Sequence, residues 1–234
     1  MSSLDMLDSI AEDIRVVLEA KNAARDGAIN QSRVLIRYCA NAIRAVHRHE
    51  WDLAQERLAI AQQAANDMRA QVAAYPDLYH SGYTQDALKE YVEACATYAL
   101  VRGDTLPSPA SLGVEHATYL NGLAEAATEL RRQILDIIRQ GHSAEAERLL
   151  EAMDMIYDVL ITFDFPDAIT GGLRRRMDTV RSVLERTRGD VTNSLRQQQL
   201  REALVELEQR IGLEVLNNGG VEFEVDDDTA EAES

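Results

Sequence analysis

The stretch SRVLIRYCANAIRAVHR, residues 32–48, decides the fold class because it carries two different faces at helical spacing. Apolar residues recur at intervals of four, three and four, and arginines recur at intervals of four, seven and four. At about 100 degrees per residue, each set stays on one side of an α-helix, and the two sets lie opposite each other. One face is therefore expected to be buried, and the other to present guanidinium groups. The apolar set is Leu35, Cys39, Ala42 and Val46, and the arginine stripe is Arg33, Arg37, Arg44 and Arg48.

Nearly every other long segment also repeats apolar residues three and four positions apart, and strand-like alternation is confined to VEFEV, residues 221–225. This spacing predicts an all-α protein, a bundle of about seven helices. Proline and glycine gather in YPDLYHSGYT, DTLPSPASLG and FDFPDAITGG, so we expect the chain to leave long helices there. The expected helices run over residues 3–25, 28–48, 51–73, 84–102, 115–140, 144–162 and 171–211.

The length of 234 residues allows one domain with a large core. We expect one helical domain over residues 1–212 and an acidic tail over residues 213–234, whose composition favours a solvated disordered end over a regulatory arm. Cys39 and Cys95 form no C-x-x-C pair and are expected to be buried free thiols. No run approaches the roughly 20 apolar residues that span a bilayer, so we expect a cytoplasmic protein without a membrane partner.

Acidic residues dominate the charge of the chain, with a formal net charge of -16 and a pI near 4.7. Overall charge therefore repels a polyanion, and any nucleic-acid site must be a local basic patch. Of the 24 basic residues, only Lys21 and Lys89 are lysines. Excess acid with almost no lysine indicates a halophilic protein, adapted to a cytoplasm of very high salt in which phosphate contacts are weakened.

The arginine stripe is a candidate nucleic-acid site because guanidinium forks fit phosphate geometry. An exposed face whose arginines pair with acids of neighbouring helices explains the same pattern, and composition alone favours that alternative. A second basic cluster begins the last expected helix, but its residues point in several directions: Arg174, Arg175, Arg176, Arg181, Arg186 and Arg188.

Two pairs of carboxylates stand at helical spacing. Glu90 and Glu93 are three residues apart in KEYVEA, and Glu125 and Glu129 are four apart in GLAEAATELRR, so each pair faces one way from its own helix. If the two helices face each other, four oxygen ligands converge, which suits Mg²⁺ or Mn²⁺. The spacing alone is a weak signal in a chain with 40 acidic residues, where a solvated helix face is the alternative.

The sequence lacks the motifs of phosphate-loop folds, of serine nucleophiles and of histidine metal sites. The sequence contains no phosphate-binding glycine loop and no G-x-S-x-G elbow. The histidines form no H-x-x-x-H pair and no E-x-x-H ligand set, so each is expected to be an ordinary surface or capping residue. They are His47, His49, His80, His116 and His142.

Four stretches, spread over roughly residues 25–200 and in the expected order, resemble the translin superfamily, which comprises translin and translin-associated factor X, and especially its single-chain archaeal members. They are SRVLIRYCANAIRAVHRHEWDLAQERL, LKEYVEA, LGVEHATYLNGLAEAATELRRQILDIIRQG and FPDAITGGLRRRMDTVRSVLERTRGDVTNSLR. The resemblance implies an all-α fold of about seven helices and a closed homo-oligomer, commonly an octamer, that encloses single-stranded RNA or DNA.

The resemblance also implies a catalytic site, because the factor X subunit is the catalytic partner of an endoribonuclease. Its E-x-x-E motif is matched by Glu90 and Glu93. Its D-x-x-x-E motif before a basic pair is matched by Glu125 and Glu129, with glutamate in place of aspartate at 125. We therefore expect a Mg²⁺-dependent (or Mn²⁺-dependent) endoribonuclease acting on single-stranded RNA, with these four glutamates as metal ligands and the arginine stripe on phosphates. A noncatalytic oligomeric module for single-stranded DNA or RNA is the alternative, and a purely structural bundle is a third.

Overall fold

The computed structural model describes residues 3–141 and 143–211, and within these ranges every regular element is a helix. The long helices are α1 (Ser3–His47), α2 (Trp51–Val72), α4 (Gly82–Arg102), α6 (His116–Ile138), α7 (Ala144–Leu160) and α9 (Leu173–Ile211). The predicted all-α fold is confirmed. The expected tail over residues 213–234, including VEFEV, lies outside the described residues, so its boundary at 212 stays a prediction.

The three proline-rich breaks fall where the sequence places them, but each holds one helical turn. These turns are α3 (Pro76–Tyr79), α5 (Pro109–Leu112) and α8 (Asp167–Thr170). Proline stands at the first turn of α3 and α5 and immediately before α8, where its missing N–H removes no helical hydrogen bond. Gly113 and Gly171 then end α5 and α8 with positive φ angles.

The expected break between residues 25 and 28 is wrong, because α1 runs through it without interruption. A single internal glycine costs a helix only about 1 kcal/mol, and no proline stands nearby. Gly27 leaves room for the side chain of Gln71 on α2, and Ala28 is fully buried in the core. Packing against α2 therefore outweighs the weak helix propensity at Gly27.

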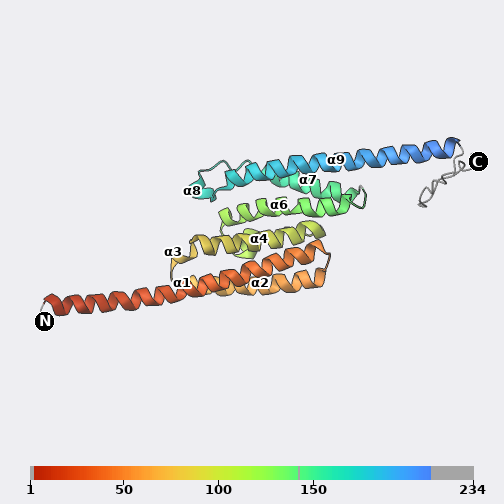
Figure 1. Ribbon diagram of the computed structural model, residues 1–234. Helices are drawn as coiled ribbons and strands as arrows, with labels where there is room; N and C mark the ends of the chain where they lie inside the picture. Colours follow the sequence, from red (N-terminus) through yellow and green to blue (C-terminus); the bar gives the residue numbers. More distant parts are fainter. Residues whose placement is uncertain (1–2, 142, 212–234) are drawn as a thin grey trace, which may run out of the picture. The chain divides into compact units, whose positions relative to one another are not determined.

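The described residues divide into two units, one that ends at residue 194 and one that begins at residue 195. In the first unit α1 packs on α2 and α4, α4 packs on α6, and α6 packs on α7 (Figure 1). The beginning of α9 joins the core through Leu173, Met177 and Val180, which cluster with buried residues of α6. The predicted buried face of the quoted stretch is confirmed: Leu35, Cys39, Ala42 and Val46 are fully buried.

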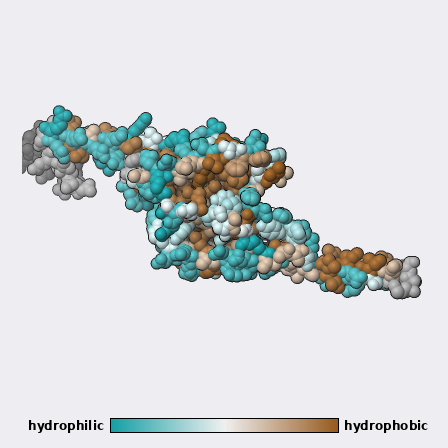
Figure 2. Space-filling view, turned by 180° about the vertical axis from the view of Figure 1, so that it is seen from behind, coloured by the Kyte–Doolittle hydropathy of each residue, from teal (hydrophilic) through white to brown (hydrophobic). Residues whose placement is uncertain are grey.

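The N-terminal part of α1 carries large apolar side chains that have no cover within the described residues, and Figure 2 shows them as an apolar surface. We call this set the α1 apolar segment: Met6, Leu7, Ile10, Ile14, Val16, Val17 and Leu18. In the second unit, Leu200, Leu204 and Leu207 are likewise exposed, on one face of α9. Among the described helices, none combines the length and the apolar character that crossing a bilayer requires.

Helices α4 and α6 approach each other closely at Gly122. A Cβ atom at Gly122 would lie 2.6 Å from Cβ of Val92 and 2.7 Å from the carbonyl oxygen of Lys89. Real Cβ atoms do not come so close, and a backbone oxygen cannot turn away as a side chain can. The glycine therefore sets the distance between α4 and α6.

We predict that Gly122→Ala lowers the free energy of unfolding by about 1–3 kcal/mol, because the added methyl group forces α4 away from α6. Chemical denaturation followed by circular dichroism measures the change. Gly189→Ala is the matched control: Gly189 lies within α9 with open space around its Cβ position, and alanine there should stabilise the helix by about 0.5–1 kcal/mol. Equal effects of the two substitutions would contradict a tight contact at Gly122.

Candidate active site

The carboxylates of the two sequence motifs lie on the facing sides of α4 and α6. Glu90, Glu93 and Glu125 are half-buried, and one carboxylate oxygen of each lies within 4.8 Å of the corresponding atoms of the other two. We call these three residues the carboxylate cluster. Glu129, expected as the fourth member, lies outside this set and is held by another partner, although its charge still acts on Glu93.

Glu93 is the member of the carboxylate cluster that lacks a cation. No ion pair or hydrogen bond reaches its carboxylate from any part of the chain that the structure describes. Burial, followed by the charges of Glu90, Glu125 and Glu129, raises the pKa of Glu93 to about 8. At neutral pH this carboxyl therefore keeps its proton unless further positive charge enters the cluster.

The other two members are neutralised by basic residues of the protein. Lys89 is only 9% exposed, and its ammonium contacts Oε1 of Glu90 at 3.0 Å and Oε2 of Glu125. Nε of Arg176 on α9 donates to Oε1 of Glu125 at 2.9 Å. Burial lowers the pKa of Lys89, but its hydrogen bonds to Glu125 and Glu90 outweigh burial, and the pKa is raised. Lys89 is therefore a fully charged ammonium at neutral pH.

The sequence interpretation assigns neither of these basic residues to the carboxylate site. The sequence predicts that the arginines at residues 174–176 point in different directions. They do: Arg176 turns inward, while Arg174 and Arg175 stay exposed. The available signal for Lys89 was its rarity, since it is one of two lysines and adjoins the E-x-x-E motif.

Glu129 is held by His47 at the end of α1. Nε2 of His47 lies 2.5 Å from Oε1 of Glu129, and Nδ1 lies 3.4 Å from Oε1 of Gln133, whose Nε2 is 3.0 Å from Nε2 of His49. The hydrogen bond from His47 lowers the pKa of Glu129, although burial opposes it. The expectation that His47 is an ordinary surface residue is wrong, because its side chain is buried against α6.

The arginine stripe is exposed along its whole length. Its members form no ion pair with the residues that the structure describes; Arg44 donates to Oδ1 of Asn41 at 2.8 Å, and Arg37 lies over the ring of Tyr38. Among the described residues of a single chain, acidic side chains of neighbouring helices therefore do not neutralise the arginine stripe. Arg44 stands one helical turn before His47, so the stripe borders the side of α1 that reaches Glu129.

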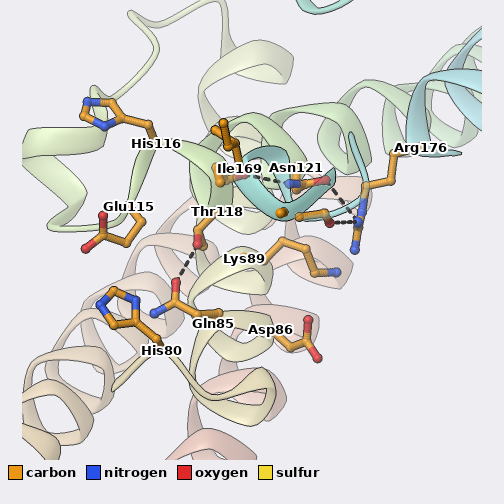
Figure 3. Close-up of a pocket in the computed structure, with 13 residues that line it drawn as sticks. His80, Gln85, Asp86, Lys89, Glu115, His116, Thr118, Asn121, Ile169 and Arg176 are labelled. Atoms are coloured by element: carbon orange, nitrogen blue, oxygen red, sulfur yellow. Dashed lines mark hydrogen bonds between the residues drawn. The ribbon is translucent and has the colours of Figure 1, made fainter. Parts of the chain in front are cut away.

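A polar cavity of about 580 Å³ adjoins the carboxylate cluster. Lys89 and Arg176 form the wall shared with the cluster, and His80, Glu115 and His116 line the opposite part (Figure 3). Asn121 fixes this geometry: its amide donates to the carbonyl oxygens of Ala117 and Thr170, and its Oδ1 accepts from Arg176 at 3.0 Å. Lys89 and Arg176 thus stand between the cluster and this cavity, and Glu125 itself lines a second cavity together with Arg175 and Arg176.

The carboxylate cluster fits a hard divalent cation. Its donors are oxygen atoms, which Mg²⁺ and Mn²⁺ prefer, and its three carboxylates converge from two helices fixed by the contact at Gly122. The unpartnered Glu93 also favours a cation site, because a cation bound there would stabilise the ionised form of its carboxyl group. Glu129 adds negative charge beside the cluster without belonging to it.

Comparisons with known proteins agree with this architecture. No protein-family model matches the chain. An uncharacterised protein of Methanocaldococcus jannaschii is 30% identical over 189 residues, which cover 80% of this chain and 83% of that protein. The crystal structure of AfC3PO has a TM-score of 0.76, and a complex of AfC3PO with duplex RNA has a TM-score of 0.70; both share 32% identity and cover 81% of this chain and 98% of theirs. Apo-NeC3PO, 23% identical with a TM-score of 0.68 over 83% of this chain and all of its own, shares the fold.

The raised pKa of Glu93 predicts a pH-dependent stability. Its carboxyl has an ordinary pKa of 4.5 and a folded value of about 8, so between these values the folded state holds the extra proton. The free energy of unfolding should therefore fall as pH rises from about 5 to 8, by at most about 1.4 kcal/mol per pH unit. Glu93→Gln cannot ionise, so we expect the variant to exceed the wild type in stability at pH 8 and to converge with it near pH 5. Urea unfolding in EDTA measures both.

Glu129→Gln is the control of opposite sign. The folded pKa of Glu129 is lowered, so its stabilising contribution is present above its ordinary pKa and is lost as pH falls through the folded value. This variant should be less stable than the wild type at pH 7, with the difference closing in acid. If the free energy of unfolding of Glu93→Gln changed with pH in the same way as that of the wild type, the raised pKa of Glu93 would be contradicted.

Proposed function

The chain belongs to the translin family, and on that premise we propose that it binds RNA and cleaves it as a divalent-metal-dependent endoribonuclease. The observation that carries the proposal is the convergence of Glu90, Glu93 and Glu125 beside a polar cavity. AfC3PO, which shares the fold at 32% identity, has been solved with duplex RNA. Single-stranded RNA is the substrate that we infer for cleavage, because an unpaired strand can bend into a site set between two helices.

In this proposal the carboxylate cluster holds Mg²⁺ or Mn²⁺. The ion supplies positive charge against the negative charge that develops on a phosphate during cleavage. The residues around it supply the rest: Arg176 orients Glu125, His47 orients Glu129 and keeps it ionised, and Asn121 holds Arg176 in place. Glu129, which the sequence places among the ligands, acts here as a charged neighbour of Glu93.

The arginine stripe is proposed to bind the phosphates of the strand. Its four guanidinium groups are exposed and have no acidic partners among the described residues, so they remain available in a chain whose net charge is -16. Because the stripe borders the His47 side of α1, a strand lying along it leads toward the carboxylate cluster. DNA offers the same phosphates, so the stripe alone does not select RNA.

A homo-oligomer completes the proposal. The α1 apolar segment and the exposed leucines of α9 are faces that a second copy of the chain would cover, since contiguous exposed apolar surface marks an interaction site. We infer a closed assembly, an octamer as the family implies, working in a cytoplasm of high salt. Enclosure would slow the escape of RNA where screening weakens phosphate contacts.

A noncatalytic binding protein for single-stranded DNA or RNA is the second candidate. It is favoured by one observation: Glu90, Glu125 and Glu129 already have basic partners within the protein, as carboxylates in a structural network do. Under this alternative the carboxylate cluster and Glu129 together tie α1, α4, α6 and α9 to one another, and no cleavage occurs with any ion.

End-labelled single-stranded and duplex RNA, incubated with the protein at high KCl with Mg²⁺, Mn²⁺ or EDTA, test the activity. We expect cleavage of the single strand with either ion and none in EDTA, and a loss of at least about 100-fold in Glu93→Gln, since the substitution removes a ligand charge while keeping the shape of the side chain. Glu151→Gln, an exposed glutamate of α7, should cleave as the wild type does. Binding of RNA without cleavage under every condition would favour the noncatalytic binding protein over the endoribonuclease.

The arginine stripe is tested by the salt dependence of binding. Arg37→Ala with Arg44→Ala should weaken binding to single-stranded RNA and flatten the slope of log K against log salt by about 1 to 2, because two phosphate contacts are removed. Fluorescence anisotropy over a KCl series measures it. The control is Arg186→Ala on α9, an exposed arginine outside the stripe, which should leave the slope unchanged. An unchanged slope in the double variant would remove the stripe from the binding site.

A further inference from the structure

Lys89 stands where a divalent ion would bind. Its ammonium contacts two of the three members of the carboxylate cluster, Glu90 and Glu125, and its side chain also lines the neighbouring cavity. Lysine presents a compact charge on a flexible stem, whereas arginine presents a rigid fork. In a chain with 24 basic residues and two lysines, the charge placed inside this cluster is thus of the more movable kind.

Glu125 has no oxygen left without a cationic partner. Its Oε1 accepts from Arg176 and its Oε2 contacts Lys89. Arg176 is anchored at two further points, because it also donates to Oδ1 of Asn121 at 3.0 Å and to the carbonyl oxygen of Gly171 at 3.4 Å. Lys89 is held by the carboxylates alone.

A divalent ion and the Lys89 ammonium cannot both keep this position. An ion that takes one oxygen each from Glu90 and Glu125 comes to rest beside a like charge in a half-buried site, where repulsion is poorly screened. One of the two basic residues must then withdraw. Arg176 is fixed by its other contacts, while Lys89 has a flexible stem and open space in the adjoining cavity.

We propose that Lys89 is a place-holding cation that neutralises Glu90 and Glu125 in the metal-free protein and withdraws into the adjoining cavity when a divalent ion binds. The proposal rests on the proposed function, since it assumes that the carboxylate cluster takes a metal. The cavity is also lined by Asp86 and Glu115, so the displaced ammonium would have acidic neighbours there other than the carboxylate cluster.

Nuclear magnetic resonance of lysine side chains tests the movement directly, because the chain has only two lysines. In protein labelled with ¹³C,¹⁵N-lysine, saturating Mg²⁺ should shift the ε-methylene signal of Lys89 and speed the exchange of its ammonium protons. Lys21, which pairs with Asp77 on the surface, is the internal control and should not change. An unmoved Lys89 signal in protein that has bound Mg²⁺ overturns the proposal.

Metal affinity gives the second measurement. Calorimetric titration with Mn²⁺ should show about tenfold tighter binding, or more, by Lys89→Met than by the wild type, because a like charge beside the ion is removed. Lys21→Met should bind as the wild type does, and Lys89→Gln replaces Lys89→Met if the latter does not fold. Equal or weaker binding by the Lys89 variants overturns the place-holding role and leaves the proposed function standing. Absence of Mn²⁺ binding in the wild type and the variants overturns the metal site itself.

Discussion

The close approach of α4 and α6 at Gly122 is the constraint on which the site depends. Only a residue without a Cβ lets the Lys89 carbonyl and Val92 come so near to α6. Gly122 and Glu125 are three residues apart and therefore share the face of α6 that meets α4. The close contact of the two helices at Gly122 therefore also places Glu125 near Glu90 and Glu93. The same glycine determines both the packing of the helices and the geometry of the carboxylate cluster.

Electrostatics then determine how the carboxylates behave. Three half-buried carboxylates in one place need positive charge, and the described chain supplies Lys89 and Arg176 to two of them. Glu93 forms no ion pair with the described residues; burial and then the neighbouring carboxylates raise its pKa to about 8, which the charge of Lys89 offsets only in part. The metal-free cluster is therefore incompletely neutralised, and a divalent ion would bring more charge than the lysine that it replaces. A structural network has no need of that deficit, which is why the deficit favours a metal centre.

The sequence predicted the helical fold and the carboxylate pairs because both depend on local spacing. Apolar residues three and four apart set the buried face of α1, and Glu90 and Glu93 share a face for the same reason. The contacts of Lys89, Arg176 and His47 were missed because they join residues 36, 51 and 82 positions apart. The break expected at Gly27 was wrong for a related reason: propensity is local, whereas packing on α2 decides the outcome.

This protein uses arginine on its exposed stripe and lysine inside the carboxylate cluster, and the two environments differ in how strongly charge is screened. In the proposed high-salt setting an acidic surface would gain little from any single exposed cation, so the proposed binding by the arginine stripe would depend on fork geometry and on four groups together. Inside the carboxylate cluster screening is weaker, and one ammonium suffices to neutralise two glutamates. An arginine at this position would hydrogen-bond both carboxylates through several N–H donors, and a metal ion would displace it less easily. Lysine gives up its place more readily, so its presence at residue 89 is suited to a site that exchanges one cation for another.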